Sequence, residues 1–431
     1  VLYRIMTTTR TNPANEAGPN KTDMALHWLN RALIRQNSDT LKLAAKYAFD
    51  PIQPVSPSSE GIQYDGSYFQ HGSQLQIASY GGELMKTTVA FLEFFDQTQF
   101  QIATDKLETF SRFARETYFG TMRGRAFPYM LTGRGVTRSG YTLRPGDAAM
   151  AKSLASSDSN HKSEYELIAK HLERTSPASE GINPVSKLYY IGDFISHNRP
   201  EYQYTIRTAS SRTYRSEGGN DEGYETYFMS DGSNSILQDG EEYGNIYAVW
   251  DWAKLPGVTN PLLPRGHIPN SQSSMAAGTS TPGTQSFVGG VTDSLYSAYA
   301  YTMRDSWATN NRQGKRVSIS TIADKAWFLF DEEIVCLGSG LTSNATHADL
   351  GDLELITTVN QGLLKGEILV GTKSGAVEKY GLGVNKEYDN DVQWVIHNNI
   401  GYIFPKGGQI RLETGTKSGA WSDINYSQSS D

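Results

Sequence analysis

Cysteine is almost absent from this sequence of 431 residues, in which Cys336 stands alone. A single thiol excludes an internal disulfide framework and a zinc site built on cysteines. Long apolar runs are also lacking, and no segment approaches the roughly 20 apolar residues that a membrane-spanning helix needs. The 39 lysines and arginines are outnumbered by 46 aspartates and glutamates, which leaves a formal charge of −7. This acidity argues against a nucleic-acid-binding protein, because such proteins need excess cations to displace counterions.

The composition is otherwise that of a folded protein. Hydrophobic residues make up 38% and aromatic residues 11% of the chain, which excludes a disordered protein. The length predicts two or three domains. The first residues, VLYRIMTTTR, lack the apolar core of a signal peptide and an initiator methionine. We therefore expect a processed or truncated chain, in which a missing export signal says little about the compartment.

The spacing of apolar residues changes near residue 175. Before that point they recur every three or four residues, as in amphipathic helices. Helices are expected at residues 22–36, 39–49, 83–95, 99–118 and 162–174. We expect Thr22 or Asp23 to cap the first of these and Ser38 the second. Because Pro-, Gly- and Ser-rich loops join the helices, the pattern indicates a stacked array or toroid of helical hairpins.

After residue 175 the chain reads as β-structure, with alternating or β-branched runs. Strands are expected at residues 202–208, 316–322, 326–330, 334–337 and 368–371, and within 392–405. Asp331–Glu332–Glu333 and Asn398–Asn399 are expected to be hairpin turns, and residues 256–285 an irregular loop. Numerous strands without intervening helices indicate antiparallel sheets stacked as a sandwich. The prediction is an α+β multidomain chain, with a helical domain over residues 1–175 and a β-domain over residues 176–431.

Arginine is concentrated in one segment of this acidic chain. Between residues 112 and 144 seven arginines stand with a single acid, Glu116, and no lysine. The guanidinium group binds carboxylates and sulfates in planar, bidentate geometry, so the segment indicates an anionic ligand. Arg134 and Arg138 lie between glycines in LTGRGVTRSG, which favours a binding loop. For Arg112 and Arg115, a solvated helix face is an equal alternative.

A glycine-punctuated stretch precedes these arginines. Residues 63–82 read QYDGSYFQHGSQLQIASYGG and contain His71, Gln74, Gln76 and Tyr80. From spacing alone, burial in the core is the commoner use of such a histidine and tyrosine. Beside an arginine cluster a chemical use becomes more favourable. Histidine titrates near neutral pH, and a tyrosine between guanidinium groups loses its proton more readily and can act as a base.

Several blocks of the sequence together resemble polysaccharide lyase family 8. In chain order the blocks are NKTDMALH, GIQYDGSYFQHGSQLQIASYGG, GRGVTR, RSEGGN, YAVWDWAKLPG, FVGGVTD and KAWFLFDEEIVCLGSG. The resemblance is closest to the bacterial chondroitin AC lyases, with hyaluronate and xanthan lyases as more distant relatives. It runs from about Asn20 to the carboxyl end. The fold that it implies is an incomplete α/α toroid followed by antiparallel β-sandwich sheets.

The resemblance also implies an activity and a set of catalytic residues. The activity is β-elimination on a 4-linked hexuronate glycosaminoglycan, either chondroitin sulfate or hyaluronan, which yields a 4,5-unsaturated uronate. Asn20 and His71 match residues that neutralise the uronate carboxylate. Tyr80 matches the residue that removes the C5 proton and returns a proton to the departing O4. Arg134 matches an arginine that supports the tyrosine, and Glu217 a glutamate that orders the network.

Substrate binding is expected from a second set of residues. Arg138 matches the second arginine of the GRGVTR block, and Gln70 and Gln74 lie in the block of His71. An anionic polysaccharide is therefore the expected partner, and a secreted or periplasmic location the expected setting. No cofactor is expected, because Ala253 stands where a second acid would help the calcium site of related enzymes. Calcium near Asp251 is the minor alternative.

Three departures from the family pattern keep other functions open. The family has further toroid helices before the block of Asn20 and further sheet regions beyond the end of this chain, and residues 256–285 carry no tryptophan. The first two put the completeness of the cleft in doubt, and the third the substrate preference. The alternatives are a catalytically impaired glycosaminoglycan-binding protein and a glycoside hydrolase. Hydrolysis requires a pair of carboxylic acids, which the Arg/His/Tyr cluster lacks.

Overall fold

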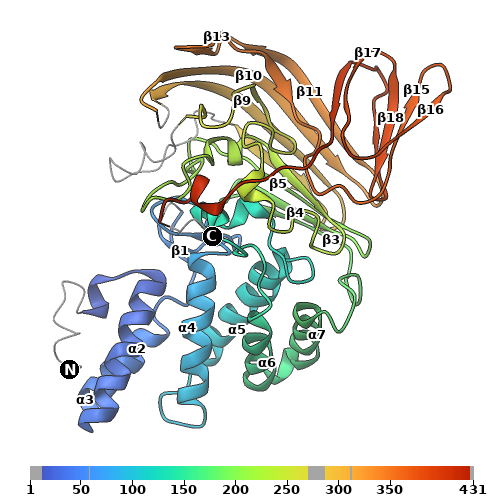
Figure 1. Ribbon diagram of the computed structural model, residues 1–431. Coiled ribbons are helices and arrows are strands. Elements are labelled where there is room, and N and C mark those ends of the chain that lie inside the picture. Colours follow the sequence, from blue (N-terminus) through green and yellow to red (C-terminus); the bar gives the residue numbers. More distant parts are fainter. Residues whose placement is uncertain (1–11, 58, 270–286, 311–312, 428–431) are drawn as a thin grey trace.

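Helices gather at one end of the molecule and sheets at the other in the computed structural model (Figure 1), which describes residues 12–57, 59–269, 287–310 and 313–427. Three consecutive pairs of helices form the helical layer. They are α2 (Gly18–Arg35) with α3 (Ser38–Ala48), α4 (Tyr80–Phe95) with α5 (Thr104–Arg112), and α6 (Asp147–Ser157) with α7 (Lys162–Glu173). Helix α4 packs between α2 and α6. The predicted fold class is confirmed.

The helix boundaries correct several expectations. Helix α2 begins at Gly18, so neither Thr22 nor Asp23 is its N-cap. Pro19 lies in the first turn, where its missing N–H costs nothing, and the Thr22 hydroxyl instead donates to the Pro19 carbonyl at 3.0 Å. The cap of α3 is Asn37, whose side chain accepts from the Thr40 N–H at 2.8 Å, and Ser38 is already helical.

The segment predicted as one helix over residues 99–118 also differs from the prediction. Helix α5 begins at Thr104, and a π-helical turn, Phe113–Tyr118, continues it. Helix α6 was not predicted. Its sequence, DAAMAKSLASS, has alanine and serine at most positions, so the apolar stripe that marks an amphipathic helix is faint.

The β-half contains two large sheets that face each other. The first has the order β3-β4-β5-β6, with strands Val185–Tyr189, Phe194–Asn198, Gln203–Arg207 and Ser233–Leu237. The second has the order β13-β12-β10-β9-β8, with β11 also paired to β10. Its strands are β8 Val288–Thr292, β9 Ser297–Asn310, β10 Arg316–Leu329, β11 Ile334–Ser343, β12 Thr346–His347 and β13 Gly351–Asp352. Pairing within both sheets is antiparallel, as predicted.

The remaining strands form smaller sheets. Two short pairs are β1 (Gly61–Ile62) with β2 (Tyr68–Phe69), and β7 (Thr259–Pro261) with β14 (Leu355–Thr357). The carboxyl-terminal sheets have the orders β16-β15-β18-β19 and β17-β20. Their strands are β15 Ile368–Thr372, β16 Val377–Tyr380, β17 Asn385–Asp389, β18 Val392–His397, β19 Ile400–Ile403 and β20 Gln409–Glu413.

Both predicted hairpin turns are confirmed. Residues 331–333 connect β10 to β11, and Asn398 and Asn399 connect β18 to β19 with φ angles of 51° and 62°. Two consecutive residues with positive φ are the signature of a type I′ turn, which asparagine tolerates. The prediction of an irregular loop over residues 256–285 is wrong at strand β7. The later part of that range, from residue 270 on, lies outside the described residues.

The two strands predicted at residues 316–322 and 326–330 are one continuous strand, β10. The two predicted segments leave out Ala323, Asp324 and Lys325, which belong to the strand. Lys325 nevertheless points inward, only 8% exposed, and its ammonium group donates to the Gly257 carbonyl. Burial lowers the pKa of Lys325 to about 8.

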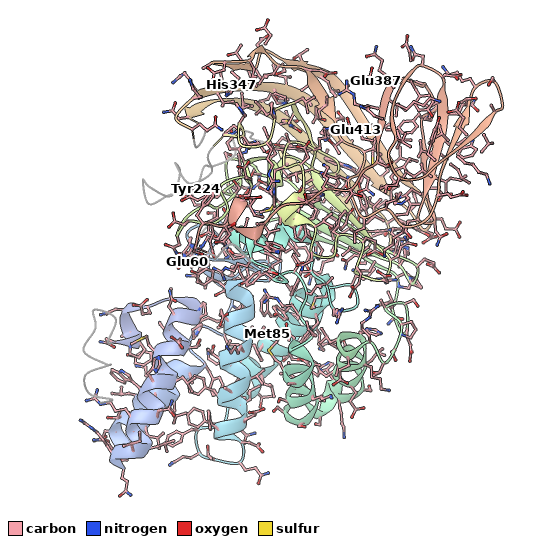
Figure 2. The ribbon with its side chains drawn as sticks, in the orientation of Figure 1. Glu60, Met85, Tyr224, His347, Glu387 and Glu413 are labelled. Carbon is pink, nitrogen blue, oxygen red and sulfur yellow. The ribbon has the colours of Figure 1, made fainter. Side chains whose placement is uncertain are left out.

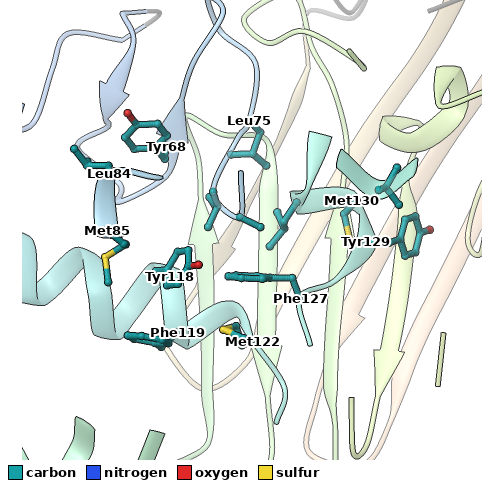
Figure 3. Close-up of a cluster of buried hydrophobic side chains, with 14 of the residues drawn as sticks. Tyr68, Leu75, Leu84, Met85, Tyr118, Phe119, Met122, Phe127, Tyr129 and Met130 are labelled. Atoms are coloured by element: carbon teal, nitrogen blue, oxygen red, sulfur yellow. The ribbon is translucent and has the colours of Figure 1, made fainter. Parts of the chain in front are cut away.

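One hydrophobic core crosses from the helices into the β-half. It contains Met85 and Phe91 of α4 together with Trp252 and Val317 of the β-half. Figure 3 shows part of this core, with Met85 and Phe119 in the helical layer. A second cluster, including Tyr204 and Trp327, fills the space between the two large sheets and makes them a sandwich. Because the first core is continuous, the boundary predicted near residue 175 stays a prediction.

No helix within the described ranges is both long enough and apolar enough to cross a lipid bilayer.

Candidate active site

The His71 turn lies where the helical layer meets the sheets. His71 follows β2 and has a φ of +58°, a conformation that costs free energy in a non-glycine residue and is therefore held by its surroundings. Glu60, labelled at this level in Figure 2, accepts from the Gln70 side chain at 2.5 Å and from the Gly72 N–H at 3.0 Å. Gly72 has a φ of +75°, and a Cβ there would lie 2.6 Å from the ring of Tyr214. The backbone on both sides of His71 is thus fixed.

Tyr80 is the first residue of α4 and lies beside the histidine. The ring centroids of His71 and Tyr80 are 4.7 Å apart, with the rings inclined at 68°. Tyr80 and Arg134 also line the same pocket. The start of α4 therefore places the tyrosine between an imidazole and a guanidinium group.

Arg134 lies within a short 3₁₀ turn, Gly133–Thr137, and Arg138 follows directly at the end of that turn. The glycines of this turn are required by close contacts. Gly133 has a φ of +55°, and a Cβ there would lie 2.6 Å from the Gln76 amide oxygen. A Cβ on Gly135 would lie 2.3 Å from the ring of Tyr141. The glycines that flank Arg134 let its loop pack closely against the wall of the site.

Glu217 reaches the cluster from the β-half. Its carboxylate is only 1% exposed, and its Oε1 accepts from His71 Nδ1 and, at 2.6 Å, from Arg134 Nη1. Its Oε2 accepts from Gln76 Nε2 at 2.5 Å. Burial raises the pKa of Glu217, but the hydrogen bond from His71 and the charge of Arg134 outweigh burial, so the net pKa is lowered. The carboxylate is therefore ionised at neutral pH.

A second buried glutamate follows after a tight turn. Gly219 and Glu222 exchange backbone hydrogen bonds around Asn220 and Asp221, which both have positive φ. The Glu222 carboxylate accepts from Arg138 at 2.8 and 2.7 Å in a bidentate pair, and it lies 3.4 Å from Arg134 Nε. Burial raises the pKa of Glu222, but the hydrogen bonds and charge of Arg138 outweigh it, and the net pKa is lowered.

The end of the described chain returns to this loop (Figure 1). Asn425 is fully buried, and its side chain donates to Glu222 at 3.2 Å. The Tyr426 N–H donates to the Asp221 carbonyl at 2.8 Å. The arginine–glutamate cluster is therefore held by three parts of the sequence that lie far apart.

A pocket of 180 Å³ opens above the cluster. Its lining residues are Gln76, Ser79, Tyr80, Glu83, Thr132, Arg134, Gly135, Arg138, Tyr141 and Glu217. A cavity of 490 Å³ adjoins it and shares Ser79, Glu83 and Tyr141 with it. The predicted residues Tyr80, Arg134, Arg138 and Glu217 thus share one concave site, and His71 joins it through Glu217 and Tyr80.

Asn20 does not line this pocket. It lies half-buried in the first turn of α2, next to Gly18, whose Cβ position is 2.6 Å from the Tyr68 hydroxyl and 2.7 Å from the Gln70 side chain. Asn20 therefore sits close to the strand that leads into His71, and its catalytic role stays a prediction.

The two glutamines predicted to bind substrate are buried. Gln70 is 1% exposed and is held by Glu60, and Gln74 is fully buried. Neither lines the pocket, so a substrate contact by either residue stays a prediction.

The arginines outside the site hold the protein together. Arg115 donates to Glu164 of α7 at 3.0 Å, so it is not the solvated residue considered above, whereas Arg112 is exposed. Arg123 is buried and donates to backbone carbonyls of the β-half, and Arg144 donates to the Ala78 carbonyl at 2.9 Å. Clustering in the sequence therefore did not distinguish binding arginines from structural ones.

Sequence reasoning missed four residues of the network. They are Glu60, Gln76, Glu222 and Asn425. The sequence offered a signal for Gln76 alone, which lies in the stretch of His71 and Tyr80. Glu222 and Asn425 reach the site through long-range contacts that spacing does not encode, and Glu60 acts from a loop 10 to 12 residues before the residues that it holds.

Among the described residues, no group of three histidine, cysteine, aspartate or glutamate side chains is arranged to hold a metal ion. At the alternative calcium position, the Asp251 carboxylate accepts from the Ala253 N–H at 3.2 Å and lies 3.6 Å from the Lys254 ammonium.

The network fixes the protonation pattern of His71. Because ionised Glu217 can only accept, Nδ1 must carry a proton and Nε2 is left for the cleft. The imidazole is 32% exposed, so a ligand can reach it. An aligned imidazole, a phenol and two guanidinium groups can bind a carboxylate and stabilise negative charge that develops on it.

Comparison with known proteins places this arrangement in a family. The chain is 35% identical to chondroitinase-AC of Pedobacter heparinus over 98% of its own length and 56% of that protein. It is 26% identical to the xanthan lyase of Bacillus sp. strain GL1, over 90% of this chain and 43% of that one. The chain thus spans about half the length of these relatives.

The fold is also that of a solved structure. A chondroitinase AC lyase, whose structures include complexes with oligosaccharides, superposes with a TM-score of 0.86 at 34% identity, over 97% of this chain and 58% of that one. Residues 4–183 match the N-terminal alpha-helical domain of polysaccharide lyase family 8, and residues 184–431 match its super-sandwich domain. The chain belongs to polysaccharide lyase family 8.

Proposed function

We propose that this protein cleaves a 4-linked hexuronate glycosaminoglycan by β-elimination, as a lyase of the chondroitin AC type. The observation that carries the proposal is that Tyr80 and Arg134 line one pocket together with Glu217, whose buried carboxylate also holds His71 against Tyr80. The similarity to chondroitinase-AC of Pedobacter heparinus supports the substrate class.

The first step is removal of the C5 proton. A proton next to a carboxylate is weakly acidic, so the developing enediolate needs donors placed where the charge appears. In the proposal His71, through Nε2, and Asn20 bind the uronate carboxylate. Tyr80, deprotonated beside the guanidinium group of Arg134, takes the proton from C5 and becomes a neutral phenol. Elimination then breaks the C4–O4 bond, and a proton passes from Tyr80 to O4.

The two buried glutamates support positioning rather than acid catalysis. A glycoside hydrolase needs one carboxylic acid that is protonated at working pH beside a second that is ionised. Glu217 and Glu222 are both paired with arginines, and the pKa of each is lowered. They are thus suited to hold His71 and the arginines, not to donate a proton.

Further parts of the proposal concern the substrate and its setting. Arg138 is 36% exposed beside Glu222, so its guanidinium group can bind a substrate carboxylate or sulfate in addition. Gln70 and Gln74 would act through the shape of the His71 turn, because they are buried. We propose that the side chains of the site act without a resident metal, and that the protein works outside the cytoplasm, where polymeric glycosaminoglycans occur.

The test is an incubation with chondroitin sulfate and, separately, with hyaluronan. The proposal predicts that ultraviolet absorbance from the conjugated uronate rises in step with new reducing ends. His71→Ala should abolish both signals. His161→Ala is the matched control, since that histidine pairs with Asp158 in the helical layer at 2.9 Å, whereas His71 pairs with Glu217, which lines the pocket.

Two other results would contradict the proposal. Reducing ends without new absorbance would identify a hydrolase. Retained polymer binding with neither signal would identify a glycosaminoglycan-binding protein.

A further inference from the structure

The amide of Gln76 makes the third contact to the Glu217 carboxylate. Oε1 of Glu217 receives both His71 and Arg134, whereas Oε2 receives Gln76 Nε2 at 2.5 Å. Gln76 is fully buried and lines the pocket. This contact therefore fixes the rotation of the Glu217 carboxylate about its last side-chain bond.

The orientation of the Gln76 amide is itself fixed. Its oxygen accepts a hydrogen bond from the Ser79 hydroxyl, so its NH₂ group must face Glu217. Gly133 packs against the same amide. The backbone of Gln76 ties β2 to α4, because its N–H donates to the Tyr68 carbonyl and its carbonyl accepts from the Gly81 N–H, at 2.9 Å each. The side chain cannot turn without disturbing the start of α4, where Tyr80 lies.

We infer that Gln76 is a positioning residue, which aligns Glu217 so that one carboxylate oxygen holds His71 and Arg134 together. The inference rests on the proposed function. A carboxylate that lost its Oε2 contact could rotate about its last bond and move Oε1 away from the imidazole. Gln76 is neutral, so it supplies this alignment without changing the charge of the site.

Charged groups surround the Gln76–Glu217 contact. His71 and Tyr80 face it from the helical side, together with Arg134 and, beyond them, Arg138 paired with Glu222. Arg207 lies behind Glu217 in the β-half, fully buried, where burial lowers its pKa to about 10. With these cations nearby, a second carboxylate at position 76 would be tolerated, but it would repel Glu217 when ionised.

Two substitutions test the inference through different physics. Gln76→Leu keeps the volume and removes the donor, so kcat should fall about 10- to 100-fold, as expected for one hydrogen bond to a charged group, while KM changes little.

Gln76→Glu can donate to Glu217 only while the new carboxyl is protonated. Two carboxyls in one site raise the apparent pKa of one of them. The kcat of Gln76→Glu should approach that of the unchanged protein at the acid end and fall as the pH rises.

Gln63→Leu is the matched control. Gln63 is a buried glutamine of the same segment, whose amide donates to the Ser59 and Gly61 carbonyls rather than to the site. Its loss should lower the melting temperature without changing kcat per folded molecule.

The outcomes separate this inference from the proposed function. If the unchanged protein forms no unsaturated product, the proposed function itself fails. If it is active and Gln76→Glu follows the same pH profile as the unchanged protein, the positioning role is wrong. A loss in Gln76→Leu that is fully explained by the fraction unfolded, as for Gln63→Leu, would also overturn it.

Discussion

Replacing Glu217 by glutamine should impair turnover far more than folding. Glutamine has nearly the same size, but it offers one acceptor oxygen where three donors converge: His71, Arg134 and Gln76. If the new oxygen faces His71 and Arg134, the new NH₂ group faces the NH₂ of Gln76. If it faces Gln76, the NH₂ group faces His71 and Arg134. Either arrangement breaks part of the network.

The magnitude follows from the burial of the pair. Removing one partner of a buried ion pair costs about 3–5 kcal/mol in stability. Arg134 keeps a second carboxylate, Glu222, at 3.4 Å, so we expect a loss of about 3 kcal/mol in the free energy of unfolding. The effect on kcat is larger because His71 loses the acceptor that fixes its tautomer. The corresponding Asp-to-Asn change in a serine protease triad lowers kcat about 10⁴-fold, and we expect a loss of about 10²–10⁴ here.

The assay is the initial rate of ultraviolet absorbance from chondroitin sulfate, normalised to the folded fraction from a melting curve. Glu241→Gln is the matched control, because Glu241 also pairs across the helix–sheet interface, with Arg125 at 2.8 Å, but lies outside the pocket. Retention of more than about a tenth of kcat in Glu217→Gln would refute a role in ordering the site.

Tyr80→Phe should lower kcat at least about 10²-fold with polymer affinity retained, which initial rates and a binding isotherm would measure together. Asn20→Ala should cost about 10²–10³ in kcat, and a complex that holds Asn20 far from the uronate carboxylate would contradict this. Arg134→Ala should reduce kcat strongly and exposed Arg112→Ala hardly at all, whereas equal losses would indicate a diffuse electrostatic patch. Because the pKa of Glu222 is lowered in the folded state, its pairing stabilises the protein fully above the unfolded-state pKa, and the stabilisation is lost as the pH falls through the folded-state pKa. Melting temperatures below about pH 4.5 should accordingly fall less steeply in Glu222→Gln, and parallel curves would contradict that linkage.

Periodicity predicted the order of helices and strands but not where each begins. The apolar stripe of α2 was visible, yet its start depends on Pro19 and on Gly18 packing against Tyr68, a contact with another part of the chain. Strand β10 was divided in the prediction at residues 323–325, yet Lys325 within that gap is buried and donates to the Gly257 carbonyl, 68 residues away.

The sequence predicted those site residues that lie in short, recognisable sequence blocks. Family resemblance pointed to His71, Tyr80 and Arg134, and the structure brings them together. The acids that hold these side chains are harder to find. Glu222 acts on Arg138 across 84 residues, and Glu60 acts on Gln70 and Gly72 from 10 and 12 residues upstream. Each glutamate stands in a segment of ordinary turn residues. Such partners become visible only once the helical layer and the sheets are packed against each other.

The most direct test of β-elimination is the mass of the product formed in isotopically labelled water. Elimination breaks the C4–O4 bond and consumes no water, so a defined chondroitin oligosaccharide should yield an unsaturated fragment that is one water lighter than the hydrolysis product. The new reducing end should carry no solvent oxygen when the reaction is quenched promptly. Saturated fragments with solvent oxygen at the new reducing end would contradict the account.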